Sequence, residues 1–313
     1  MVAQEQAGNF RCLVADIGGS NMRVAIAERG SLQALQTFAS EEVSDPGRIL
    51  ADYVAAAGGL RHAVIAVAGP VEGERFSLTN RDWVSSPREL SRLLAMDRVV
   101  IVNDFAAMAH SVTGLTNGDL APIRAGAPVP DGNVLLCGPG TGFGVSAMVK
   151  QGDSAIATEA GHMRLGAVNG EESEIFARLQ QGRPPLAIED VLSGRGFVAL
   201  DRGLNGMQRP PGDILAAAAA KDAGAERTLR MFMRVFGRVA GDLALAFDAR
   251  GGIFIGGGLG LALRPFYALP EFHAAYEAHE PYADRLRQIP ISLIAHPYPG
   301  LLGAAEIARR LFG

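Results

Sequence analysis

The stretch Asp16-Ile-Gly-Gly-Ser-Asn-Met-Arg23 constrains the fold more than any other part of the sequence. It lies between two short apolar runs, Cys12–Ala15 and Val24–Ala27, and two such runs joined by a Gly-Gly turn predict a buried β-hairpin. Gly18 and Gly19 can adopt positive φ and carry no side chain, so a ligand can approach the backbone closely. The stretch therefore predicts either a ligand-binding turn or, on these residues alone, an ordinary solvated hairpin.

A second hairpin of the same kind is predicted where a Gly-rich loop follows the apolar run at Leu135. The loop Gly138-Pro-Gly-Thr-Gly-Phe-Gly144 offers backbone N–H groups and the Thr141 hydroxyl, which suit an anion. It does not match the dinucleotide fingerprint, because Phe143 takes the place of a glycine and a strand, not a helix, is expected to follow. Two such hairpins, one per domain, would be able to hold a phosphate chain between their turns.

Strands and helices alternate in the first part of the chain. Asp45-Pro46 predicts the start of a helix that ends near Ala57. Apolar runs predict strands over 62–68 and 98–103, and the second leads directly into a helix. This alternation favours an α/β domain with a largely parallel sheet, and the Gly, Pro and small polar residues over 113–131 mark the expected domain boundary.

Composition disfavours several functional classes. The net charge of −4 and the lack of a long basic run argue against a nucleic-acid partner. No uncharged apolar stretch of about 18 residues is present, so no membrane span is expected. The polar start up to Phe10 does not read as a signal peptide. Both cysteines, Cys12 and Cys137, lie in apolar runs, which suits a reducing cytoplasm better than a disulfide framework.

Two aspartates at predicted strand ends are candidates for chemistry. Asp16 ends a buried strand and is suited to hold a hydrated Mg²⁺, which binds one or two carboxylates together with substrate phosphates. Asp104 follows a strand at the edge where open α/β sheets bind ligands. It is either the N-cap of the next helix or a general base that accepts a proton from an attacking hydroxyl.

A further set of polar residues suits a ligand with many hydroxyl groups. Carboxylates, amides and an imidazole together accept from and donate to such hydroxyls. Glu159 and His162 are alternatively a structural pair, whereas no third residue at a recognisable spacing supports a metal site. Gly256-Gly-Gly258 is either a tight turn or a surface under an adenine ring. The predicted set is Asn80, Asn103, Asp104, Glu159, His162 and Glu189.

Eight stretches, taken in order, make the chain resemble the bacterial ATP-dependent glucokinase family, within the hexokinase–actin–Hsp70 superfamily. The resemblance runs nearly from end to end, and its specificity lies in the order and spacing of the stretches. They are Asp16–Asn21, Leu78–Trp83, Asn103–Phe105, Gly138–Gly144, Glu159–His162, Glu189–Gly194, Ile255–Gly258 and His296–Gly303.

The resemblance implies two actin-like (ribonuclease H-like) α/β domains that flank a cleft. The smaller domain is expected to comprise 1–113, completed by the C-terminal helix within 303–313, and the larger one 114–302. The implied activity is transfer of the γ-phosphoryl group of Mg-ATP to the 6-hydroxyl of glucose, the first step of glycolysis. A cytoplasmic homodimer without nucleic-acid or membrane partners is expected. The alternatives are a kinase for another hexose or amino sugar, and a silent sugar-binding regulator.

By the same resemblance, Asp104 is the catalytic base and Asp16 holds Mg²⁺ through water. The implied sugar-binding residues are Asn80, Asn103, Glu159, His162 and Glu189. The implied ATP-binding residues are Asp16, Gly18, Gly19, Ser20, Asn21, Gly138, Gly140, Thr141, Gly142 and Gly257.

Three positions depart from the family pattern. Ser20 stands where threonine is usual and keeps the hydroxyl, Ala160 replaces a glycine, and Arg195 replaces a proline. The last two flank sugar-binding positions, so they bear on sugar preference more than on phosphoryl transfer. The chain also lacks the Cys-rich zinc motif of the repressor/open-reading-frame/kinase branch, and strand-like residues from Arg11 leave no place for an N-terminal helix-turn-helix.

Overall fold

The computed structural model describes residues 10–69, 71–72, 75–77, 83–151, 153–180, 182 and 185–313. The chain divides into two compact units. Unit 1 comprises the described residues up to Thr116 together with His296–Gly313, and unit 2 comprises Asn117–Ala295. The predicted sugar ligand Asn80 lies outside the described residues.

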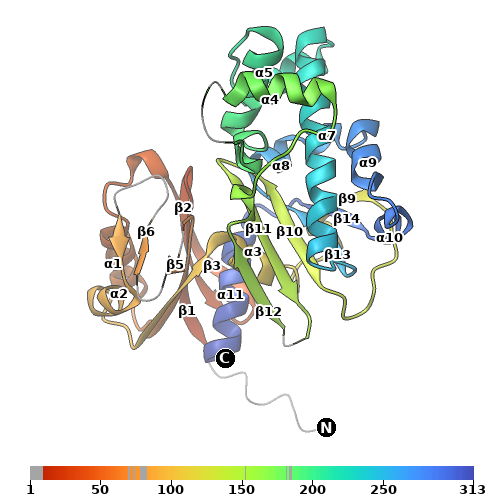
Figure 1. Ribbon diagram of the computed structural model, residues 1–313. Helices are drawn as coiled ribbons and strands as arrows, with labels where there is room; N and C mark the ends of the chain where they lie inside the picture. The colour runs from red at the N-terminus through yellow and green to blue at the C-terminus, as the bar shows by residue number, and fades with distance from the viewer. Residues whose placement is uncertain are drawn as a thin grey trace. The chain divides into compact units, whose positions relative to one another are not determined.

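Unit 1 is built on a mixed sheet with the strand order β3-β2-β1-β4-β8 (Figure 1). The predicted hairpin is confirmed, because β1 and β2 pair antiparallel and Ile17 lies opposite Met22 at its turn. β1, β4 and β8 are parallel to one another. A smaller sheet has the order β5-β6-β7. The strands are β1 Arg11–Ile17, β2 Asn21–Glu28, β3 Ser31–Ala39, β4 His62–Val67, β5 Val71–Glu72, β6 Arg75–Ser77, β7 Val84–Ser85 and β8 Arg98–Asn103.

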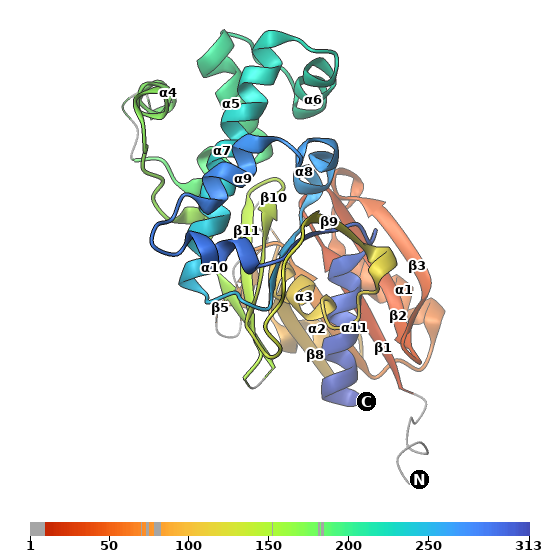
Figure 2. The ribbon, with the colours of Figure 1, turned by 90° about the vertical axis from the view of Figure 1, so that its right-hand side faces the viewer.

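Helices cover both faces of the large sheet of unit 1. Asp45 caps α1 by accepting from the Gly47 and Arg48 N–H groups, as its sequence predicts. α1 and α2 contribute Leu50 and Leu90 to the core on one face. α3 and α11 cover the other, where apolar residues of α11 pack against β1 and β4 (Figure 2). The helices are α1 Pro46–Ala57, α2 Pro87–Leu93, α3 Asp104–Ser111 and α11 Pro299–Phe312, with the 3₁₀ turn η1 Ser40–Glu42.

Unit 2 is built on a second mixed sheet, in the order β12-β11-β10-β13-β14-β9. The second predicted hairpin is confirmed, because β10 and β11 pair antiparallel with Pro139 opposite Phe143. β10, β13 and β14 run parallel, so the carboxyl end of β13 lies beside the Gly-rich loop after β10. The strands are β9 Leu120–Arg124, β10 Val134–Pro139, β11 Phe143–Val149, β12 Ser154–Thr158, β13 Gly252–Ile255 and β14 Ile291–Ile294.

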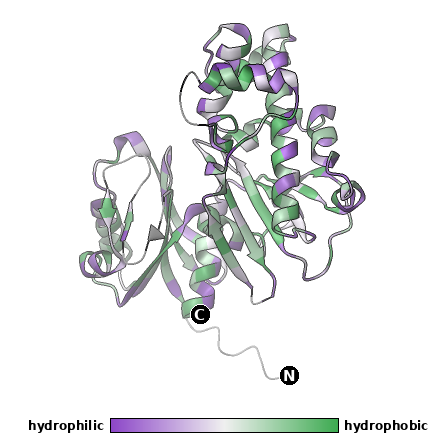
Figure 3. Ribbon diagram, viewed as in Figure 1, coloured by the Kyte–Doolittle hydropathy of each residue, from purple (hydrophilic) through white to green (hydrophobic). Residues whose placement is uncertain are grey.

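The long helix α7 provides much of the core of unit 2. Its buried Phe232 and Phe236 pack against Phe143, Phe197 and Phe272. In Figure 3 hydrophobic and hydrophilic turns alternate along α7, as expected for a helix that buries one face. The helices are α4 Gly170–Gln180, α5 Gly194–Asn205, α6 Pro211–Ala219, α7 Ala223–Ala246, α8 Gly258–Ala262, α9 Pro270–Glu277 and α10 Ala283–Gln288, with the 3₁₀ turns η2 Asn117–Asp119, η3 Ala160–His162, η4 Ile188–Asp190 and η5 Arg264–Phe266. Within the described residues, none of these helices is long and apolar enough to cross a bilayer.

Candidate functional site

The turn between β1 and β2 presents a largely buried carboxylate. The Gly18 N–H donates to the Asn21 carbonyl at 2.9 Å and closes the turn. The side chain of Asp16 is 14% exposed, and its Oδ2 lies 3.5 Å from Arg23 Nη1. Burial raises the pKa of Asp16, and the charge and hydrogen bonding of Arg23 oppose that rise. Among the described residues none accepts a hydrogen bond from the buried Nε of Arg23, so this corner has unmet polar capacity that a hydrated cation with a phosphate group would satisfy.

Asp104 lies at the same edge of the sheet as Asp16. Ile17, Val67 and Asn103 are neighbours in register on the parallel strands β1, β4 and β8. Since adjacent strands are about 4.8 Å apart, the turn after β1 and the start of α3 are about 10 Å apart. Both groups therefore occupy the carboxyl edge of the sheet, where open α/β sheets bind ligands.

Asn103, and not Asp104, is the N-cap of α3. Its Oδ1 accepts from the N–H groups of Phe105 at 3.0 Å and Ala106 at 3.1 Å. The alternative of Asp104 as N-cap is thus wrong, and Asp104 is the first residue of the helix. Because the cap uses Oδ1, the Nδ2 group of Asn103, which makes only a 3.4 Å bond to the Gly69 carbonyl, is the part suited to a ligand.

The Gly-rich loop of unit 2 is held by close backbone contacts that require glycine. A methyl group on Gly138 would come within 2.0 Å of the Gly256 carbonyl oxygen. Gly257 has φ +85°, and a methyl group there would meet the Pro139 carbonyl oxygen at 2.4 Å. The Gly140 carbonyl accepts from the Gly194 N–H at 2.9 Å, which joins the loop to the first residue of α5. The loop is therefore fixed in place while exposed Thr141 stays at its tip.

Three predicted sugar ligands lie together beside this loop. His162 Nε2 is 3.9 Å from Glu159 Oε2, and His162 Nδ1 is 3.9 Å from Glu189 Oε1. The side chain of Glu189 is only 14% exposed, and its Oε2 lies against Gly142, where a methyl group would approach it to 2.6 Å. Residues suited to hydroxyl groups thus adjoin a loop suited to an anion. Among the described residues, no group of three or more His, Cys, Asp and Glu could hold a metal ion.

Arg195 is a member of this cluster that the sequence did not reveal. Its Nη2 donates to Glu189 Oε1 in an ion pair. Arg195 is the second residue of α5, whose N-cap Ser193 also donates its hydroxyl to the Glu189 carbonyl at 2.6 Å. The departure from the family pattern was visible in the sequence, but its contact with Glu189 depends on the turn between η4 and α5.

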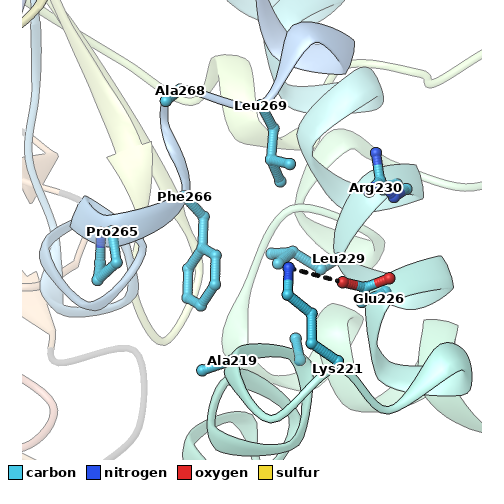
Figure 4. Close-up of a pocket in the computed structure, with 10 residues that line it drawn as sticks. Ala219, Lys221, Glu226, Leu229, Arg230, Pro265, Phe266, Ala268 and Leu269 are labelled. Carbon is cyan, nitrogen blue, oxygen red and sulfur yellow. Dashed lines mark hydrogen bonds and ion pairs between the residues drawn. The ribbon is translucent and has the colours of Figure 1, made fainter.

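A cavity of about 360 Å³ opens farther from the Gly-rich loop in unit 2 (Figure 4). Pro265 and Phe266 project from one side of it, opposite Leu229 and the ion pair of Lys221 with Glu226, whose Nζ and Oε1 are 3.2 Å apart. The cavity is within the size range of small-molecule sites. The sequence did not predict it, because its walls come from segments far apart in the chain. The lining residues are Ala218, Ala219, Lys221, Glu226, Leu229, Arg230, Pro265, Phe266, Ala268 and Leu269.

Two helices connect the loop with this cavity. α6 begins at Pro211, which lies beside Gly194, and ends at the cavity. α8 begins beside Gly140 and leads into η5, which lines the cavity. From the residues in each helix, α6 spans about 13 Å and α8 about 7 Å. The cavity is therefore at a distance from the loop that a triphosphate with its ribose can bridge.

Known proteins resemble this chain over nearly its full length. The sequence model of the family described as Glucokinase matches residues 13–311. The curated glucokinase of Sinorhizobium medicae (strain WSM419) is 36% identical over 323 residues, covering 98% of this chain and 94% of the relative.

Solved structures agree with the sequence comparison. The structure of a glucokinase from an Antarctic psychrotroph has a TM-score of 0.84 and 28% identity, covering 96% of this chain and 99% of its own. A Balamuthia mandrillaris glucokinase in complex with glucose has a TM-score of 0.82, covers 98% of this chain and 96% of its own, and at 20% identity shows the fold alone. These neighbours confirm the predicted α/β, actin-like fold class, and with the family match they establish that the chain belongs to the glucokinase family.

Proposed function

We propose that this chain is an ATP-dependent hexose kinase that transfers the γ-phosphoryl group of ATP to the 6-hydroxyl of glucose. The observation that carries the proposal is the contact between Glu189 and Gly142 in unit 2. It puts a carboxylate suited to sugar hydroxyls directly beside a loop suited to phosphate. A kinase needs these two kinds of group close together, because phosphoryl transfer depends on positioning the acceptor against the donor.

Unit 2 is proposed to position both substrates. Glu159, His162 and Glu189 accept from and donate to the sugar hydroxyls. Backbone N–H groups of the loop around Gly140 and the Thr141 hydroxyl donate to phosphate oxygens, whose charge they stabilise as the phosphoryl group moves. The close contacts of the loop preorganise these donors, so that they need little rearrangement when the substrates bind.

Unit 1 is proposed to supply the base and the magnesium ligand. Asp104 accepts the proton of the sugar 6-hydroxyl, while Asn103 fixes the first turn of α3 and offers its Nδ2 to the sugar. Asn80 is proposed as a further sugar ligand. Mg²⁺ would be held through water by Asp16, where its chemistry is to neutralise charge on the phosphate oxygens. Catalysis then requires both units, since neither contains all of these groups.

The nucleoside of ATP is proposed to occupy the cavity lined by Phe266. The arrangement of α6 and α8 supports this, since both begin at the phosphate loop and lead to the cavity. The Phe266 ring offers a surface on which a base can stack. Lys221 and Glu226 offer polar groups at its edge. Gly257 lies at the start of α8 and allows the close contact with Pro139 on which this path depends.

The test is ADP release with Mg-ATP across glucose, mannose, fructose, galactose, glucosamine and N-acetylglucosamine. Asp104→Asn is expected to lower turnover by about 10²–10⁴-fold, because a general base contributes that much, while glucose still binds in calorimetry. Asp52→Asn serves as the control, since that carboxylate is 77% exposed on α1. Native turnover in Asp104→Asn would refute its role, and binding without any ADP release would favour the silent regulator.

We further propose a cytoplasmic homodimer. Burial raises the pKa of the Cys12 and Cys137 thiols to about 12, so both stay protonated and unreactive. Free buried thiols of this kind suit a reducing compartment. Sedimentation of the native protein would distinguish the expected dimer from a monomer or a larger assembly.

A further inference from the structure

Arg195 alters the charge that the sugar cluster presents. Its guanidinium pairs with Glu189 Oε1, the oxygen that also faces His162. Glu189 is 14% exposed, whereas the Arg195 side chain is 63% exposed and reaches the carboxylate from the first turn of α5. Glu189 keeps free lone pairs for a hydroxyl, because a carboxylate accepts about four hydrogen bonds. Arg195 therefore need not leave when a sugar binds.

The pair is poorly suited to a purely stabilising role. An ion pair between groups of this exposure contributes about 0–1 kcal/mol to stability. Its electrostatic effect on a ligand is larger, since the cluster of Glu159, Glu189 and neutral His162 would carry two negative charges without Arg195 and carries one with it. A hexose is small enough that any charged substituent on it falls within a Debye length of these groups.

We propose that Arg195 is a specificity-determining residue that favours neutral hexoses over sugars carrying an ammonium group. Its positive charge cancels the attraction that Glu189 would otherwise exert on an ammonium group, and adds direct repulsion. Its N–H groups donate to hydroxyl oxygens but have no acceptor for an ammonium. This inference rests on the proposed function, because it takes the Glu189 cluster as the sugar site.

The experiment compares glucosamine, glucose and 2-deoxyglucose, at a pH where the amine is protonated. In Arg195→Gln the kcat/KM of glucosamine relative to glucose should rise by about three- to tenfold, as expected for removing one charge a few ångströms away in a solvated site. The 2-deoxyglucose ratio should stay constant, since that sugar is neutral. Arg195→Lys keeps the charge and should behave like the native protein, as should Arg202→Gln on the exposed side of the same helix.

Calorimetric titration without nucleotide gives the same ratios from dissociation constants. An unchanged glucosamine ratio in Arg195→Gln, or an equal rise for 2-deoxyglucose, would overturn the inference. A change in Arg195→Lys equal to that in Arg195→Gln would also overturn it, because charge would not be the cause. If sugars bind with the expected ratios but are not phosphorylated, the proposed function fails while the inference holds. If no sugar binds, both fail.

Discussion

Replacing Gly142 with alanine should weaken sugar binding, although Gly142 belongs to the proposed phosphate loop. The new methyl group would lie 2.6 Å from Glu189 Oε2, which is closer than carbon and oxygen can approach. The carboxylate is the end of a flexible side chain, so it should rotate away at little cost to folding. It would then lose its alignment with His162 and Arg195.

The magnitude follows from the hydrogen bonds that a displaced Glu189 can no longer make. A hydrogen bond to a charged group contributes about 1.5–3 kcal/mol net. The dissociation constant of glucose, measured by calorimetry without nucleotide, should therefore rise by about 10- to 150-fold. Gly140→Ala is the matched control, because its methyl group would meet nothing nearer than the Gly258 nitrogen at 3.9 Å. Its glucose affinity should stay within about twofold of the native value.

A double-mutant cycle tests the physical cause. If Gly142→Ala acts through Glu189, then adding it to Glu189→Gln, where the charged acceptor is already gone, should cost less than about 0.5 kcal/mol further. An equally large loss of glucose affinity in both backgrounds would refute the reasoning. So would a native glucose affinity in the single Gly142→Ala variant.

Two further predictions concern other parts of unit 2. Phe266→Ala should raise the KM for ATP by about 5- to 150-fold, as loss of base stacking predicts, with glucose affinity unchanged; Leu261→Ala on exposed α8 is the control, and equal KM values would contradict the cavity assignment. Arg209→Met should lower the free energy of unfolding by about 3–5 kcal/mol, because it leaves fully buried Asp201 without its ion-pair partner. Burial would raise the pKa of Asp201, but hydrogen bonds from Arg209 and Asn205 outweigh it and hold that pKa below its ordinary value. The native advantage should thus be full above the unfolded pKa of about 3.9 and disappear as pH falls through the lower folded pKa; urea unfolding at several pH values measures it, and an advantage that persists in acid would contradict this account.

Elements with strong local signals were predictable from the sequence. α1 begins at Pro46 and ends at Ala57 as expected, because its cap, its proline and its apolar spacing all lie within the helix. β3 was not predicted, since Ser31–Ala39 is mostly polar and exposed and forms a strand by pairing with β2. Its structure depends on a neighbour and not on its own pattern.

The candidate site was predictable to a similar extent. The sequence identified Glu159, His162 and Glu189 as one set, and the structure brings them together. It could not decide that Asn103 caps α3, because Asn103 and Asp104 are both good capping residues at adjacent positions. The cavity beside Phe266 was invisible for a different reason, since its walls depend on how α6, α7 and η5 pack.

The position of α11 in unit 1 has a consequence for how the protein is made. Leu301, Ala304 and Ala308 complete a core that includes Val14 and Ala107, yet α11 is translated after the whole of unit 2. At about 5–20 residues per second the ribosome needs roughly 10–35 s to synthesise unit 2. During that interval the apolar face of the first sheet that α11 will cover is exposed to water and to chaperones. Unit 2 is therefore expected to finish folding first, which makes the earliest part of the chain to emerge the latest to become stable.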